Sequence, residues 1–188
     1  MKKIVAIMGS PRKNKNTDVI LSEILKTVDI NKYEIKKIYL SDLNIKPCTS
    51  CYYCAKTGKC CIDDDMQNLY PLFDESDIVI MSSPLYFNSL SAISKTMIDR
   101  CQMFWSSKYK YGKASIDRNK ERKGIFVSSA GSPYIKGQFQ ASIPVIDLFF
   151  KSINVKYTDN LFCSNTDLVP AHFRKDILNR AIEIGKNL

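Results

Sequence analysis

Short apolar runs alternate along the chain with segments whose apolar positions recur every three or four residues. The runs have the length and composition of buried strands, and turn residues bound each of them. The predicted strands are Lys3–Met8, Glu34–Leu40, Asp77–Ser82, Lys123–Ser128 and Val155–Phe162. The predicted helices are Thr17–Val28, Met66–Asp74, Ser91–Phe104, Gln138–Lys151 and Ala171–Lys186. Strands that alternate with helices indicate an α/β fold, with a doubly wound five-stranded parallel sheet and helices on both of its faces.

The segment Leu43–Asp65 interrupts this rhythm, because it has little hydrophobic periodicity and holds five of the seven cysteines. We interpret it as a functional insertion after the second strand. No linker rich in Pro, Gly or Ser divides the chain. We therefore expect residues 1–188 to form a single domain.

Composition and charge narrow the class of protein. With 45% hydrophobic and 25% charged residues the chain resembles ordinary globular proteins. The net charge of +9 comes from lysines and arginines that are scattered along the chain, without a nucleic-acid-binding motif, so we expect no nucleic-acid partner. The first apolar run is too short for a signal peptide or a membrane span. A cytoplasmic protein without a membrane partner and without a disulfide framework is the expectation.

The loop Gly9–Thr17 joins the first strand to the first helix and is polar throughout. Backbone amides at a helix N-terminus attract anions, the hydroxyls of Ser10 and Thr17 can donate hydrogen bonds, and Arg12 adds a positive charge. This pattern predicts a phosphate site. The alternative is a plain capped turn, in which Asn16 or Thr17 is the N-cap of the helix.

Two further loops follow the third and fourth strands, over Ser82–Ser91 and Ser128–Tyr134. In an open α/β sheet these loops lie near the point where the strand order reverses, which is where such sheets bind ligands. Tyr86 and Phe87 could contact a flat ring, and the small residues of the fourth-strand loop would let backbone amides approach it. Three such loops at consecutive strand ends favour a cofactor site.

The order Gly-Ser-Pro-Arg-x-x-x-Asn-Thr, followed by Ser-Pro-x-Tyr-Phe-x-x-x-Ser-Ala-x-x-Lys-x-x-x-Asp-Arg, resembles the NADPH-dependent FMN reductase family of flavodoxin-like proteins. The resemblance implies a sheet of strand order 2-1-3-4-5 and FMN as the cofactor. It implies that the phosphate lies near Ser10, Arg12, Asn16 and Thr17 and that the ring lies against Pro84, Tyr86, Phe87 and Asn88, with Ala130 and Gly131 opposite. Many members carry glycine where this chain has Asn88.

The cysteines of the insertion follow the spacing Cys48-x2-Cys51-x2-Cys54-x5-Cys60, with Cys61 directly behind. Thiolates are soft ligands, and four of them in one loop can surround a metal ion or an iron–sulfur cluster. The alternatives are a structural zinc site, a reactive dithiol, or a motif that holds no metal. The spacing resembles that of the iron-sulfur flavoproteins, a branch of the same family, which implies a [4Fe-4S] cluster near FMN. Cys61 is an alternative to Cys60 as the fourth ligand.

The resemblance implies an FMN-dependent NAD(P)H oxidoreductase, which passes electrons from reduced nicotinamide through FMN to a small acceptor or an iron–sulfur cluster. Because the cofactor supplies the chemistry, we expect no catalytic side chain. The family also implies a homodimer or homotetramer, and the helix Ser91–Phe104 is our candidate interface. The alternatives are a flavodoxin-like electron carrier without enzymatic activity and, less favoured, a metal-regulated binding protein.

Three smaller groups of residues have structural interpretations. Asp63–Asp65 precede a predicted helix and suit N-capping and the helix dipole. Cys101 and Cys163 are expected to be buried. Trp105, Tyr109 and Tyr111 could cover a neighbouring flavin, although a packing or subunit-contact patch is the commoner role for such a cluster.

Overall fold

The computed structural model describes residues 1–188, and its strands form one sheet. The strands are β1 (Lys2–Met8), β2 (Tyr33–Tyr39), β3 (Ile78–Tyr86), β4 (Ser89–Leu90), β5 (Lys123–Ser129) and β6 (Lys156–Cys163). Five of them are parallel in the order β2-β1-β3-β5-β6, which confirms the predicted strands and the flavodoxin-like order. The short β4 pairs antiparallel with the end of β3. It was not predicted, because two residues leave no periodicity in the sequence.

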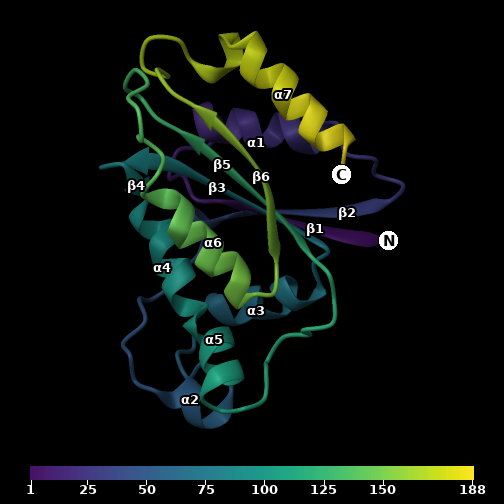
Figure 1. The fold of residues 1–188 in the computed structure, drawn as a ribbon, viewed down its shortest axis with the longest axis vertical. Coiled ribbons are helices and arrows are strands. Elements are labelled where there is room, and N and C mark those ends of the chain that lie inside the picture. Colours follow the sequence, from purple (N-terminus) through teal and green to yellow (C-terminus); the bar gives the residue numbers. More distant parts are fainter.

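Helices cover both faces of the sheet, as predicted. The α-helices are α1 (Asn16–Lys26), α2 (Tyr53–Thr57), α3 (Met66–Glu75), α4 (Ala92–Arg100), α5 (Gln102–Tyr109), α6 (Ser142–Ser152) and α7 (Lys175–Lys186). Two short 3-10 helices span Leu40–Asp42 and Ala171–Phe173. Figure 1 shows α1 and α7 on one face and α3 to α6 on the other. None of these helices combines the length and the apolar character needed to cross a lipid bilayer.

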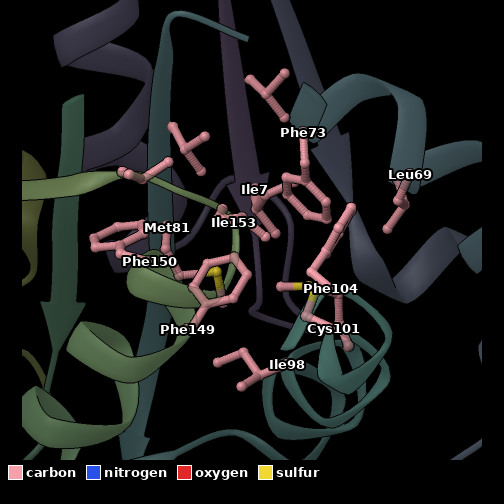
Figure 2. Packing of buried hydrophobic residues seen from close by; sticks show 14 of the residues in the cluster. Ile7, Leu69, Phe73, Met81, Ile98, Cys101, Phe104, Phe149, Phe150 and Ile153 are labelled. Atoms are coloured by element: carbon pink, nitrogen blue, oxygen red, sulfur yellow. Dashed lines mark hydrogen bonds between the residues drawn. The ribbon is translucent and has the colours of Figure 1, made fainter. Parts of the chain in front are cut away.

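The alternation of side chains along the strands builds two separate cores. Ile4 and Ala6 of β1 face the layer of α1 and α7, whereas Val5 and Ile7 face the layer of α3 to α6. The second core is rich in aromatic rings, and Figure 2 shows several of them packed around Ile7. Because both faces of the central strands are buried, these strands read as continuous apolar runs.

The single helix predicted over Ser91–Phe104 is wrong, because the structure has two helices there. Hydrogen bonds from the amide of Cys101 to the Ile98 carbonyl and from the amide of Phe104 to the Cys101 carbonyl span three residues instead of four. This tight turn ends α4 and redirects the chain into α5. Apolar positions continue at helical spacing across the break, so the sequence alone did not reveal it.

Two predicted helices begin later than expected. The helix predicted over Gln138–Lys151 starts at Ser142, where Pro144 fits the first turn because its missing N–H would be unpaired there. The helix predicted over Ala171–Lys186 starts at Lys175, because the residues before it form the 3-10 turn. Helix α2, inside the cysteine-rich segment, was not predicted.

Candidate functional site

The loops after β1, β3 and β5 meet in a pocket of about 400 Å³ at the carboxyl edge of the sheet, here named the carboxyl-edge pocket. A pocket of this size suits a small-molecule cofactor. Its lining includes all ten residues that the sequence and the family resemblance indicated: Ser10, Arg12, Asn16, Thr17, Pro84, Tyr86, Phe87, Asn88, Ala130 and Gly131. The fold therefore brings together three loops that lie far apart in the sequence.

The N-terminus of α1 forms one wall of the pocket and offers unpaired amides. The backbone N–H groups of Asn16, Thr17 and Asp18 donate no hydrogen bond within the chain. The alternative of a plain turn capped by Asn16 or Thr17 is wrong, because the cap is Lys15 and makes no side-chain capping bond. The side chains of the two predicted caps bond elsewhere, Thr17 to Ser129 (Oγ1 to Oγ, 2.6 Å) and Asn16 to the amide of Ala171 (2.9 Å).

A buried carboxylate, Asp18, holds this loop in shape. It accepts a hydrogen bond from the amide of Asn14 (2.7 Å) and pairs with Lys37. Burial alone would raise the pKa of Asp18, but the bonds from Lys37 and from the Asn14 amide outweigh burial and lower it. Because Asp18 binds Asn14 and not the first helical amides, those amides stay free to face the pocket. This role of Asp18 was not predicted from the sequence.

The β3–β4 hairpin forms a second wall. Its two central residues, Phe87 and Asn88, have φ angles of 50° and 57°, in the left-handed region that a two-residue type I′ hairpin turn requires at both positions. Asparagine is among the few residues besides glycine that adopt this conformation readily, which accounts for Asn88 at a position where the family resemblance led us to expect glycine. A phenylalanine there is strained, and the Phe87 side chain is fully exposed. Strain at an exposed aromatic residue is typical of binding sites.

The third wall contains Ala130 and Gly131, which follow β5. A Cβ at Gly131 would meet the carboxylate of Asp167, an exposed side chain that would have to move aside. Beside them lies Gln138, which is 4% exposed and donates from Nε2 to Ser132 Oγ (2.8 Å). Its Oε1 atom is buried without any partner. A buried carbonyl oxygen that lacks a partner indicates a missing donor, such as a bound ligand.

The cysteines of the insertion line a separate, smaller hollow of about 150 Å³, here named the thiol hollow. Its walls include the five clustered cysteines: Cys48, Cys51, Cys54, Cys60 and Cys61. The Sγ atoms of Cys51 and Cys61 are 3.6 Å apart. No three His, Cys, Asp or Glu side chains are grouped closely enough to hold one metal ion. The thiols therefore lie around a hollow instead of converging on one point.

Asp64 joins the thiol hollow to the protein core through a buried ion pair with Arg100. Its carboxylate also accepts hydrogen bonds from the amides of Lys46 (2.8 Å) and Met66 (3.0 Å). Burial would raise the pKa of Asp64, but the bond from Arg100, followed by those from the two amides, lowers it. The predicted N-capping of α3 is therefore only part of the role of Asp64. The assigned N-cap, Asp65, makes no side-chain capping bond.

The aromatic cluster and the remaining cysteines lie outside the carboxyl-edge pocket. The rings of Trp105 and Tyr109 lie 5.2 Å apart at an angle of 43° on the exposed side of α5, and no member of the cluster lines the pocket of its own chain. Cys101 and Cys163 are buried, as predicted. Three larger hollows are present: two of 790 and 830 Å³ lie at the amino edge of the sheet, and one of 630 Å³ lies beside α2 and α3. Parallel sheets bind ligands at the carboxyl edge, so we assign the site there.

Comparison with known proteins identifies the family. The model of the NADPH-dependent FMN reductase family matches residues 2–134. An iron-sulfur flavoprotein of Archaeoglobus fulgidus is 42% identical over 98 residues, which cover 52% of this chain and 44% of the relative. Another iron-sulfur flavoprotein of that organism is 32% identical over 146 residues, which cover 76% of this chain and 72% of the relative. In the first three curated relatives the match spans about half of their length, from 44% to 57%.

Among solved structures, the NAD(P)H:quinone oxidoreductase from Methanothermobacter marburgensis superimposes with a TM-score of 0.73. The match covers 99% of this chain and 98% of that one at 15% identity, so it supports the fold alone. The family model, in contrast, covers more than half of the sequence and includes the loops after β1 and β3. The chain therefore belongs to the NADPH-dependent FMN reductase family.

Proposed function

We propose that this chain is an FMN-dependent oxidoreductase that binds FMN in the carboxyl-edge pocket and oxidises NAD(P)H, with electrons leaving to a small-molecule acceptor. The observation that carries the proposal is the meeting of three loops in one pocket, with free helix amides at one wall and a strained aromatic hairpin at another. Membership of the FMN reductase family supports the same cofactor.

The phosphate of FMN fits the N-terminus of α1. Free amides at a helix N-terminus, together with the positive end of the helix dipole, favour a doubly charged anion. Arg12 and Lys15 line the same wall and add positive charge. The hydroxyl of Ser10 accepts a bond from the amide of Arg12 (3.1 Å), which fixes the turn that presents these groups.

The flavin ring fits between the β3–β4 hairpin and the loop after β5. Pro84, Tyr86 and Phe87 offer apolar surface on one side, and the small residues Ala130 and Gly131 leave room on the other. When bound, FMN accepts a hydride from reduced nicotinamide and passes electrons on, so the protein needs only to bind and orient it. No side chain is assigned as an acid or base.

A [4Fe-4S] cluster is our proposal for the thiol hollow, with Cys48, Cys51, Cys54 and Cys60 as ligands. In a [4Fe-4S] cluster each iron atom binds its own cysteine thiolate, so the four ligands lie around the cluster and do not meet at one point. Thiols on the walls of a 150 Å³ hollow match that requirement. The names of the curated relatives point to the same group.

The first test is an absorbance spectrum of protein purified without oxygen, together with identification of the released flavin and an assay of NADH and NADPH oxidation with a quinone acceptor. We expect FMN and nicotinamide oxidation. A protein that binds no flavin would overturn the proposal. FMN without nicotinamide oxidation would instead indicate an electron carrier, the main alternative.

Two substitutions test the two sites separately. Arg12→Ala should weaken FMN binding by about tenfold, because it removes a charge-assisted contact to the phosphate, and should leave the binding of riboflavin unchanged. Cys51→Ser should abolish the incorporation of iron, normally about four per chain, whereas Cys163→Ser should retain it. Equal FMN affinity in the first variant, or equal iron content in the second, would remove the corresponding assignment.

A further inference from the structure

Arg100 is a buried cation that borders the thiol hollow. It is 1% exposed, although arginine is seldom fully buried without a partner. Its Nη2 atom donates to Cys60 Sγ (3.4 Å) and to the carbonyl of Ile62 (3.3 Å). Its Nη1 atom donates to Asp64 and to the carbonyl of Lys46 (2.9 Å). The guanidinium therefore bonds to backbone on both sides of the cysteine run and to one of the proposed ligands.

The position of Arg100 in α4 gives its charge a second effect. It is the last residue of the helix, at the negative end of the helix dipole. That end would repel an anionic thiolate centre beside it. A guanidinium at this point reverses the sign of the local field and also supplies an N–H to the sulfur.

Arg122 shows that burial and ion pairing alone do not explain this arrangement. It is 2% exposed, pairs with Asp74 at 3.0 Å and donates to the carbonyl of Asp117 (2.7 Å). It makes no hydrogen bond to a cysteine and does not line the thiol hollow. The two arginines are thus similar in burial and differ in their contact with sulfur.

We infer that Arg100 is a positioning residue that raises the reduction potential of the thiolate-bound group in the thiol hollow, through its N–H···S bond to Cys60. The inference rests on the proposed cluster. Reduction adds negative charge to such a group, and a hydrogen bond to a ligand sulfur stabilises the more negative state. The potential is therefore higher with this bond than without it.

The test compares two double variants of anaerobically reconstituted protein. Arg100→Met with Asp64→Asn removes the bond to sulfur without leaving a buried charge unpaired. Arg122→Met with Asp74→Asn makes the same change at an arginine that donates no hydrogen bond to a cysteine. Circular dichroism checks folding, the flavin spectrum checks FMN binding, iron analysis checks loading, and a redox titration followed by electron paramagnetic resonance gives the potential.

We expect the Arg100 pair to bind FMN, to hold iron and to show a lower potential than wild type, and the Arg122 pair to show the wild-type potential. An unchanged potential in the Arg100 pair, or an equal fall in both pairs, would overturn the inference. If the Arg100 pair folds poorly, Arg100→Lys keeps the charge but loses the planar fork and should still lower the potential. If the variants fold and bind FMN but incorporate no iron, the inference is overturned, whereas the proposed flavin function is not.

Discussion

Gln138 is a residue whose environment, more than its sequence context, indicates binding. Its Oε1 is buried beside the carboxyl-edge pocket without a donor, while Nε2 is held by Ser132. We expect Gln138→Met to weaken FMN binding about fivefold, since one net hydrogen bond contributes about 1 kcal/mol. A fluorescence titration of FMN gives the dissociation constant. Gln140→Met, an exposed change two residues away, is the control, and equal affinity in the two variants would contradict the role of Gln138.

Arg12 could be predicted as a site residue from its type and its place in the sequence, whereas Gln138 could not. Arg12, Ser10 and Phe87 stand in loops at strand ends, where polar or aromatic character already predicted the pocket that they line. Gln138 lies in what the sequence indicated as a helix, and its burial depends on the loop after β5. A lone glutamine carries no periodic signal, so tertiary packing alone identified it.

At the scale of the element, the β3–β4 hairpin depends on backbone conformation. Asn88 is in the left-handed region, so Asn88→Gly should change the free energy of unfolding by less than about 0.5 kcal/mol. Asn88→Val should lower it by about 1–3 kcal/mol, because β-branched residues are strained there. Denaturant unfolding of the two variants measures the difference. Equal stability would show that the turn adopts another conformation.

The loop that begins α1 should respond to pH through Asp18. Its pKa is lowered in the folded protein, so the carboxylate stabilises the fold fully above about pH 4, the ordinary range of aspartate. As the pH falls, the unfolded chain binds the proton first, and the free energy of unfolding decreases until the folded pKa is passed. Unfolding measured from pH 5 to pH 3 should therefore show a flatter dependence in Asp18→Asn. Parallel curves for variant and wild type would contradict this prediction.

Elements with a strong period were predicted well and their ends poorly. The five parallel strands are confirmed, because buried strands leave continuous apolar runs in the sequence, and so is their order, which the family resemblance implied. The break at Cys101 and the strand β4 were missed, since a tight turn inside an apolar stripe and a two-residue strand change no pattern. The role of Asp18 at the start of α1 was also missed, because it depends on Lys37, which is distant in the sequence.

For the whole molecule, we expect a homodimer or homotetramer formed through the outer side of α4 and α5. Exposed residues recur there at helical spacing and end in the neighbouring rings of Trp105 and Tyr109. Aromatic residues are enriched in subunit interfaces. Trp105→Glu should reduce the assembled mass measured by light scattering, whereas Ile30→Glu, an exposed change elsewhere, should not. A monomeric wild-type protein would contradict the expectation.

Helix α4 links the two sites of the molecule. At its start, Ser91 Oγ donates to the carbonyl of Gly9 (2.6 Å), next to the carboxyl-edge pocket, and at its end Arg100 borders the thiol hollow. Figure 1 shows α4 running from the side of β4 toward α5 and α2. Nine residues of helix measure about 13 Å. With the proposed FMN and cluster bound, this helix would be a spacer of fixed length between them, and that length would limit how fast electrons pass from one group to the other without any movement of the chain.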